Sequence, residues 1–403
     1  MAETTDGHGA LKGIRVVELS HMIMGPSCGM FLAFLGADVI KVEPPGGDKT
    51  RDLTGMGRGF FPTFNRGKRS VQLDLKSPEG RRALEALLST ADVLVENFRD
   101  SSLEAMGLAP DQLRARYPNL IVVSCKGFLE GPYETRPALD EVVQMMTGMA
   151  HMTGPTGRPL RIGSSANDIM AGLFGAFAVL AELLKAERFG GKEGRGAAIR
   201  VGLFENCLLL VAQHMVQFAV EGTEAPPMPE RAFSWAVYDI FKTRDNRQVF
   251  VGAVTENQWR TLCRLLDLPE LLNDPSLQTR MEQIEARART IPIVGEAIAE
   301  RDFADVVGAL QDAGLPFSPI ARPIEMYDDP QANYPGRMPT TMMDDGESFT
   351  APALPYEVDG EKVTPSRVDL PGIGADTDAV LDSLQIPAED KLAASGKTKA
   401  PAQ

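Results

Sequence analysis

The 403-residue chain predicts an α/β protein in which an open sheet of parallel strands forms a large domain and a smaller α+β domain is inserted into it. Three observations support this prediction. Short apolar segments rich in β-branched residues alternate with helical segments up to Cys125, as in successive βαβ units. A long apolar segment follows at Ile169–Leu184. Residues Glu221–Arg231 (EGTEAPPMPER) then form a segment rich in proline and glutamate, which is typical of a linker.

The first βαβ unit predicts a ligand site close to the start of the chain. Ile14–Leu19 and Asp38–Glu43 are strand-like, and a helix is expected at Pro26–Leu35 because proline suits a first helical turn. The preceding turn, His21–Met24, lies where such units commonly bind a phosphate or nucleotide at a helix N-terminus. The unit lacks a GxGxxG sequence, which argues against NAD or FAD.

Further strands extend this sheet. We expect strands at residues 68–74, 92–96 and 120–125, and helices at residues 77–89 and 110–117. The predicted large domain is therefore an open parallel-sheet, Rossmann-like domain. Its ligands should lie outside the carboxyl ends of the strands. Those ends carry His21–Met24, Asn97–Arg99 and Lys126–Gly127.

Asp168 stands at the head of the long apolar segment, Ile169–Leu184. A helix that is apolar on every side is expected to be buried, and the helix dipole should favour the ionised form of a carboxylate in its first turn. Gly172 and Gly175 leave room for a close neighbour on the following turns. Such a carboxylate could act as a nucleophile, but carboxylates commonly cap helices. The residues alone therefore favour the capping interpretation.

A second, smaller domain is expected after the linker. Two strands joined by the polar turn Arg244–Arg247 indicate a hairpin, and several amphipathic helices follow. We expect strands at 236–242, 248–254 and 317–320, and helices at 257–266, 281–299, 303–313 and 376–384. The predicted large domain comprises residues 1–225 plus 340–403, and the small domain residues 230–335.

Composition excludes several classes of function. The formal net charge of −14 argues against nucleic acid as a partner. The four cysteines form no CxxC pair and only four histidines exist, so no metal site is expected. Separated cysteines in apolar surroundings are typical of reduced, buried thiols. With neither a signal peptide nor an expected membrane span, the prediction is a cytoplasmic protein without a membrane partner.

Several motifs in fixed order resemble one known family. They are LKGIRVVELSHMIMGP, FLGADVIKVEPPGGDKTR, FNRGKRSVQLDLKSPEG, ADVLVENFRDSSLEAMGL, NDIMAGLFGAFAVLAELL, GLFENCLLL and LPGIGADTDAVL. From about Leu11 to Leu384 the chain closely resembles the family III CoA-transferases of the CaiB/BaiF type, which include formyl-CoA transferase.

The resemblance implies covalent catalysis by Asp168, because the family's catalytic aspartate falls on this position. Its carboxylate would attack an acyl-CoA to give an aspartyl anhydride and then an aspartyl-CoA thioester, without a permanently bound cofactor. The resemblance therefore favours a catalytic role for Asp168 over the capping role that the residues alone favour. Glu141 matches a glutamate near the active site of formyl-CoA transferase. The family further implies a homodimer of two interlocked chains, with a paralogous subunit as the alternative partner.

The same resemblance implies where the substrate coenzyme A binds. The implied CoA-binding residues are His21, Met22, Ile23, Met24, Leu73, Lys76, Asn97 and Phe98, with Arg99 as a further candidate for phosphate. The first four lie at a predicted helix N-terminus, and Lys76 offers a cation. A solvated Lys76 and a core Phe98 are the alternatives.

Departures from formyl-CoA transferase bear on the substrate. Pro44 and Ala105 replace arginines that reach CoA, Ile23 replaces an active-site glutamine, and the glycine-rich loop is missing around Ser234–Trp235. These differences argue against oxalate and formate and favour a larger acid. Relatives often use succinyl-CoA as donor and a second dicarboxylic acid as acceptor, which requires a cation in the pocket. The candidate cations are Arg158, Arg161 and Arg231.

Two alternative functions remain open at this point. An α-methylacyl-CoA racemase shares this fold but needs a catalytic histidine where this chain has Leu139. A non-catalytic CoA-binding subunit of a transferase complex would not need Asp168, which is present here.

Overall fold

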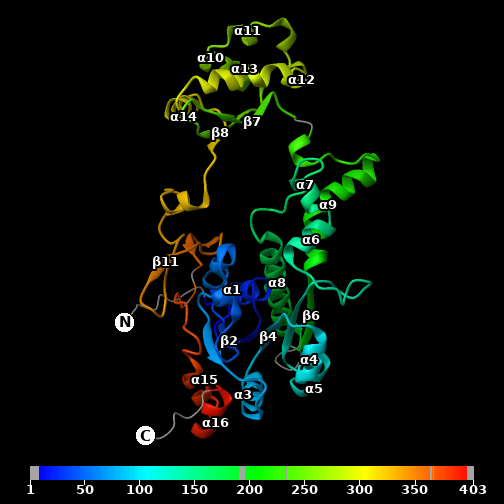
Figure 1. Ribbon diagram of the computed structural model, residues 1–403, viewed down its shortest axis with the longest axis vertical. Helices are drawn as coiled ribbons and strands as arrows, with labels where there is room; N and C mark the ends of the chain where they lie inside the picture. Colours follow the sequence, from blue (N-terminus) through cyan, green and yellow to red (C-terminus); the bar gives the residue numbers. More distant parts are fainter. Residues whose placement is uncertain (1–8, 190–195, 232–233, 364, 366, 397–403) are drawn as a thin grey trace. The chain divides into compact units, whose positions relative to one another are not determined.

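The computed structural model describes residues 9–189, 196–231, 234–363, 365 and 367–396. The chain forms two compact units (Figure 1). The large unit comprises Met1–Pro229 and Gln331–Gln403, and the small unit comprises Glu230–Pro330. Chain segments from both ends therefore build the large unit.

A six-stranded parallel sheet is the centre of the large unit, and this confirms the predicted α/β class. Its strand order is β3-β2-β1-β4-β5-β6. The bounds are β1 Arg15–Leu19, β2 Asp38–Glu43, β3 Arg69–Gln72, β4 Val93–Glu96, β5 Ile121–Lys126 and β6 Ala197–Gly202. The central strands are buried on both faces, as their continuous apolar sequences require.

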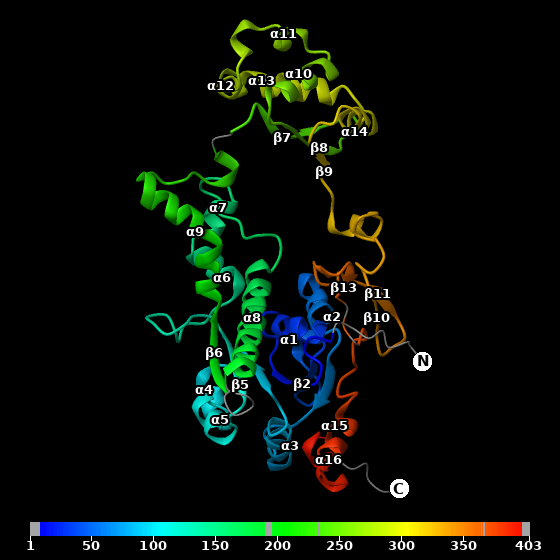
Figure 2. The ribbon, with the colours of Figure 1, turned by 180° about the vertical axis from the view of Figure 1, so that it is seen from behind.

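Helices cover both faces of this sheet (Figures 1 and 2). One face packs against α1 (Met24–Phe34), α8 (Ala166–Phe189) and the start of α9 (Leu203–Glu221). The other face packs against α3 (Pro78–Leu88), α4 (Asp100–Met106), α5 (Pro110–Arg116), α15 (Thr377–Ser383) and α16 (Ala388–Ala394). Short helices α2 (Phe60–Phe64), α6 (Asp140–Met146) and α7 (Met149–Thr153) lie in the segments between strands.

Helices α1 and α8 pack closely against each other at two glycines of α8. A Cβ on Gly172 would lie 2.0 Å from Ser27 Oγ and 2.6 Å from the carbonyl oxygen of Met24. A Cβ on Gly175 would lie 3.0 Å from Cys28 Sγ. The expectation that these glycines admit a close neighbour is confirmed, and the contact places the head of α8 beside the start of α1.

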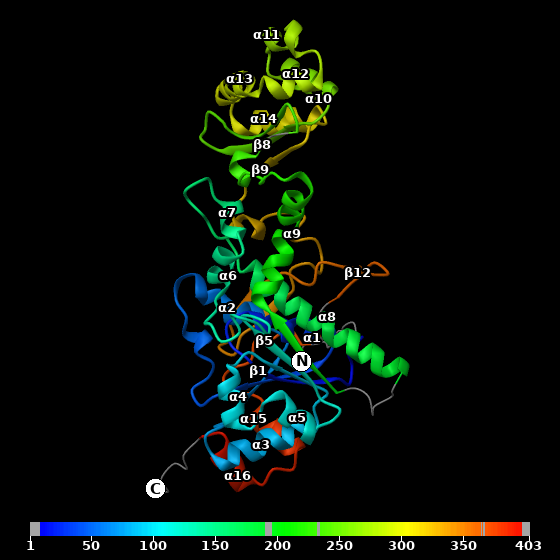
Figure 3. The ribbon, with the colours of Figure 1, turned by 90° about the vertical axis from the view of Figure 1, so that its right-hand side faces the viewer.

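The expectation that α8 is buried on every side is wrong. Its first half packs against α1 and β5, but Leu173, Phe177 and Leu184 are 49%, 64% and 49% exposed. By length and composition alone, α8 and α9 could each cross a membrane. Figure 3 shows the C-terminal half of α8 extending from the sheet. An apolar sequence predicts that a helix is buried, but it does not indicate whether the same chain or a second chain covers it.

The C-terminal segment returns to the edge of the sheet at β3. The amide N–H of Ser70 donates to Asp376 Oδ2 at 2.9 Å, and that of Asp74 donates to the carbonyl oxygen of Ala394 at 2.7 Å. Two short hairpins precede it: β10 (Thr340–Met342) with β11 (Ser348–Thr350), and β12 (Glu357–Val358) with β13 (Glu361–Lys362). The hydrogen bonds from Ser70 and Asp74 to the C-terminal segment cover the edge of β3 that would otherwise be exposed.

The small unit is an antiparallel sheet covered by helices. Its strands are β7 (Val237–Lys242), β8 (Gln248–Ala253) and β9 (Phe317–Pro319), with β8 in the middle. Its helices are α10 (Glu256–Leu265), α11 (Pro269–Leu272), α12 (Arg280–Glu285), α13 (Arg287–Ala299) and α14 (Phe303–Asp312). The single helix expected at 281–299 is in fact two, because the chain changes direction at Ala286.

Candidate active site

The site begins where the strand order reverses, between β1 and β4. Such a switch point leaves a crevice at the carboxyl ends of the strands. The amide N–H of His21 donates to Asn97 Oδ1 at 3.1 Å, and Asn97 Nδ2 donates to the carbonyl oxygen of His21 at 2.8 Å. The rings of His21 and Phe98 stack with their centroids 6.0 Å apart. Three predicted CoA-binding residues therefore meet at the crevice.

A buried ionic network holds the turn after β1. Met22 has a left-handed backbone with φ of 64°, and its N–H donates to Thr50 Oγ1 at 3.1 Å. Asp48 accepts hydrogen bonds from the N–H and the hydroxyl of Thr50. Lys41 Nζ lies 3.0 Å from Asp48 Oδ2 and 3.2 Å from Glu18 Oε1, all deeply buried. The network fixes a strained turn that leads into α1.

Asp168 lies in a cavity of about 320 Å3 at this crevice. Of the predicted site residues, His21, Met22, Ile23, Met24, Asn97, Glu141 and Asp168 line it. Phe60, Lys126, Leu139, Asp140, Arg161 and Ser165 are also among its lining residues. The cavity therefore brings together residues of α1, α2, β5, α6, α8 and α9 and of the segments that follow β1 and β4.

Burial, together with the neighbouring carboxylate of Asp140, raises the pKa of Asp168 to about 7, although the charge of Arg161 opposes the shift. The expectation that the helix end favours the ionised form is wrong, because desolvation and a second carboxylate outweigh the dipole. Within the described residues the Asp168 carboxylate accepts no hydrogen bond, so it does not cap α8. Its oxygens are free to react.

Asp140 is the second buried carboxylate of the cavity. Gln144 Nε2 donates to Asp140 Oδ1 at 3.0 Å, and the N–H of Ile162 donates to Gln144 Oε1 at 2.9 Å. Asp140 Oδ2 has no hydrogen-bond partner among the described residues. Burial raises the pKa of Asp140 as well. Two carboxyl groups in one small cavity disfavour each other's ionisation.

A second cavity, of about 860 Å3, adjoins the crevice on the β2–β3 side. The predicted residues His21, Met22, Leu73, Lys76 and Phe98 line it. Lys49 and Arg81 add two further cations to its wall, and the Lys76 ammonium makes no ion pair among the described residues. Three cations around one cavity suit a ligand with several phosphates.

Arg99 lies apart from both cavities. It lines a third cavity of about 860 Å3 together with Asn97, Phe98, Arg136 and Arg200. The predicted site residues thus divide among three adjoining cavities, and His21 lines all of them.

Sequence reasoning missed part of the cavity around Asp168. The sequence patterns indicated Lys126 only as the end of a strand and did not indicate Asp140. The adjacent carboxylates Asp140 and Glu141 are the signal that could have identified Asp140. This signal is not specific without the fold.

The family model described as CoA-transferase family III matches residues 11–377. The chain belongs to this family. It is 31% identical to a succinate–glutarate CoA-transferase of Agrobacterium fabrum, over 90% of this chain and 92% of the relative. It is 31% identical to the human succinyl-CoA:glutarate CoA-transferase, over 81% and 75%, and 30% identical to a succinyl-CoA:mesaconate CoA-transferase of Haloarcula hispanica, over 80% and 83%.

Solved structures agree with this membership of CoA-transferase family III. A CaiB/BaiF family protein from Brucella suis superposes with a TM-score of 0.84 at 29% identity, over 94% of this chain and all of that chain. The chain is therefore a family III CoA-transferase, and its substrates are a CoA thioester and an acid.

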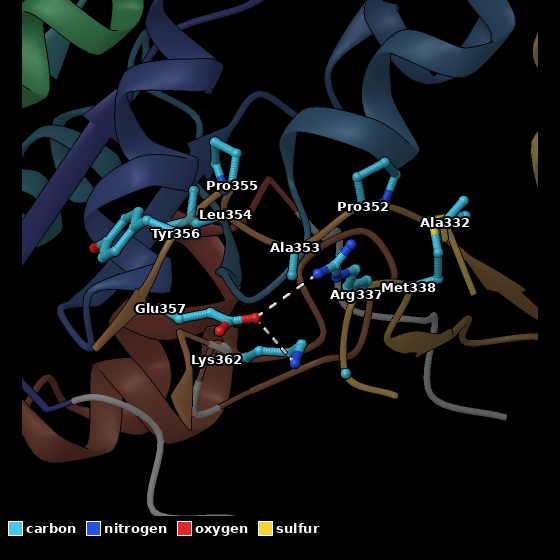
Figure 4. Close-up of a pocket in the computed structure, with 11 residues that line it drawn as sticks. Ala332, Arg337, Met338, Pro352, Ala353, Leu354, Pro355, Tyr356, Glu357 and Lys362 are labelled. Carbon is cyan, nitrogen blue, oxygen red and sulfur yellow. Dashed lines mark ion pairs between the residues drawn. The ribbon is translucent and has the colours of Figure 1, made fainter. Parts of the chain in front are cut away.

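One more cavity of the transferase, of about 620 Å3, contains none of the predicted site residues. It lies within the segment from Ala332 to Lys362. Figure 4 shows Glu357 between two cations, 4.0 Å from Arg337 and 3.2 Å from Lys362. Its charged groups are paired with each other, so we assign it no role in CoA transfer.

Proposed function

We propose that the protein transfers CoA from succinyl-CoA to a second dicarboxylic acid, with Asp168 as the nucleophile. The observation that carries the proposal is a carboxylate at the head of α8 that accepts no hydrogen bond from any residue the structure describes, in a cavity at the switch point of an α/β sheet. The named activities of several relatives, which pair succinyl-CoA with dicarboxylic acids, support the choice of acids.

In the proposed mechanism the Asp168 carboxylate attacks the acyl-CoA thioester and expels CoA thiolate, leaving an aspartyl anhydride. The thiolate attacks the aspartyl carbonyl, which releases the donor acid and leaves an aspartyl-CoA thioester. The acceptor carboxylate attacks this thioester, again expelling CoA thiolate and forming a second anhydride. The thiolate then attacks the acceptor's carbonyl, so that acyl-CoA leaves and Asp168 regains its carboxylate.

We propose that CoA lies across the crevice with its phosphates in the cavity lined by Lys49, Lys76 and Arg81. His21 lines both this cavity and the one around Asp168, so a single extended ligand can occupy both. Glu141, with a side chain 59% exposed at the Asp168 cavity, would contact the acyl group. A permanently bound cofactor has no part in this scheme.

The proposed assembly is a cytoplasmic homodimer. Exposed apolar side chains on α8 and α9, including Phe177 and Val220, offer a surface for a second chain. The four cysteines are free and buried, in keeping with a reducing compartment.

The decisive experiment is trapping of the covalent intermediate. Wild-type protein is incubated with succinyl-CoA and hydroxylamine, and the tryptic peptide that contains Asp168 is analysed by mass spectrometry. A hydroxamate on Asp168, together with loss of transfer in the Asp168→Asn variant, is expected because a neutral amide cannot form the anhydride.

The Asp382→Asn variant is the matched control, because Asp382 is exposed and belongs to the distant C-terminal segment. It should retain full activity. An Asp168→Asn protein that still transfers CoA at a near-normal rate would contradict the mechanism.

A further inference from the structure

Two cations, Lys126 and Arg161, line the cavity around Asp168, and among the described residues they differ in how far their donors are used. Lys126 Nζ lies 2.7 Å from Asp100 Oδ1 and 3.1 Å from Glu96 Oε1, and it also donates to the carbonyl oxygen of Phe98 at 2.7 Å. Its ammonium is therefore already paired with two carboxylates of the protein and hydrogen-bonded to a carbonyl oxygen. Arg161 is the other cation in the wall.

The backbone of its own loop fixes the guanidinium of Arg161. Nε donates to the carbonyl oxygen of Ile162 at 3.1 Å, and Nη2 donates to that of Ser164 at 3.2 Å. Nη1 forms no hydrogen bond among the described residues. A planar cation held on one side and free on the other is preorganised for a carboxylate.

A carboxylate of the protein already occupies this position loosely. Glu141 Oε2 lies 3.7 Å from Nη1, too far for a hydrogen bond, and its side chain is 59% exposed. Asp140 Oδ2 lies 3.7 Å from Nη2 and is buried. Glu141 can therefore move away at small cost, whereas Asp140 remains as the fixed counter-charge.

We propose that Arg161 is the specificity residue that binds the second carboxylate of a dicarboxylic acid, and that Glu141 holds this position until the acid arrives. The inference rests on the proposed CoA transfer at Asp168. The acid would place its reacting carboxylate at Asp168 and its other carboxylate on Nη1, displacing Glu141. Arg161 and Asp168 line the same cavity, so both carboxylate positions lie within it.

The structure distinguishes Arg161 from the other candidate arginines. Arg158 lies on the exposed part of the same loop and does not line the cavity. Arg231 belongs to the small unit. Arg158→Gln is therefore a matched control that removes a nearby arginine without touching the site.

The test compares two five-carbon acceptors, glutarate and pentanoate, with succinyl-CoA as the common donor. Because both reactions share the donor, the ratio of their kcat/KM values isolates recognition of the second carboxylate. Arg161→Gln should lower the glutarate-to-pentanoate ratio about 10- to 100-fold, the range expected for loss of a hydrogen bond between charged groups. Arg161→Lys should lower it less, and Arg158→Gln should leave it unchanged.

Glu141→Gln provides a second readout. Removal of the competing carboxylate should raise the ratio, whatever it does to the absolute rate. Circular dichroism of each variant establishes that it is folded.

The outcomes separate this inference from the proposed function. Wild-type protein that transfers CoA to neither acid would overturn both. If Arg161→Gln lowers kcat/KM equally for the two acids and moves the pH profile upward, Arg161 serves Asp168 and not the substrate, and the specificity role is overturned.

Discussion

Asp168 shares its cavity with Asp140, and this pairing has consequences for the pH dependence of transfer. Burial and Asp140 hold the pKa of Asp168 near 7, yet the nucleophile must be ionised. We expect kcat/KM to rise as the pH passes through about 7 and to level off above it. Asp140→Asn should move this rise to lower pH, because the variant lacks the neighbouring negative charge. An unmoved pH profile would show that another group controls it.

The same raised pKa predicts a stability effect for Asp168→Asn. The carboxyl group ionises near 3.8 when unfolded and near 7 when folded, so its contribution to the free energy of unfolding falls between these pH values. The amide of the variant does not ionise, so its contribution to the free energy of unfolding does not fall with rising pH. Allowing for the partial exposure of Asp168, the free energy of unfolding of the variant should exceed that of wild type by about 2 kcal/mol at pH 8 and by much less at pH 4.5. Urea unfolding at both pH values measures the difference, and an equal gain at both would contradict the raised pKa.

Lys76 tests the placement of the CoA phosphates. Its ammonium is exposed, and it lines the large cavity without an ion pair among the described residues. Lys76→Ala should raise the KM for succinyl-CoA about tenfold with a small change in kcat, because a phosphate contact acts on binding. Arg82→Ala is the control, since Arg82 is paired with Glu79 and does not line the cavity. An unchanged KM for Lys76→Ala would remove this residue from the site.

At the scale of elements, the contact between α1 and α8 controls where Asp168 stands. Gly172 lies one turn after Asp168, and its position admits no Cβ without displacing backbone atoms of α1. Gly172→Ala should therefore lower the free energy of unfolding by about 1–3 kcal/mol, despite the better helix propensity of alanine. It should also reduce transfer, because α8 must shift relative to the turn that begins α1.

Gly308→Ala is the matched control for this helix contact. Gly308 lies within α14, and a Cβ there would meet no atom within 4 Å. This variant should be at least as stable as wild type by thermal unfolding. If Gly172→Ala were equally stable, the close contact would not constrain α8.

At the scale of the whole molecule, the exposed apolar sides of α8 and α9 predict association of two chains. Leu173, Phe177 and Phe218 are each about half or more exposed, an arrangement that an isolated soluble chain rarely keeps. We expect a dimer by size-exclusion chromatography with light scattering. Phe177→Glu should shift the protein towards monomer, whereas Glu187→Gln should not. A wild-type monomer at micromolar concentration would contradict the dimer.

The parallel sheet and the position of Asp168 at the start of a long helix could both be predicted from the sequence. These features depend on local patterns: apolar strands alternate with helices, and a carboxylate precedes an uninterrupted apolar segment. The order of motifs was enough to identify the family, which the comparisons confirm.

The side chains that surround Asp168 could not be predicted from the sequence and follow from the folded chain. Asp140 and Arg161 come from different segments, and their approach to Asp168 depends on how α6 and the loop before α8 fold over the sheet. The same contacts reversed the expected effect on the pKa of Asp168, because desolvation depends on neighbours that are distant in sequence. The exposure of one side of α8 could likewise not be predicted, because an apolar sequence does not indicate which surface covers the helix.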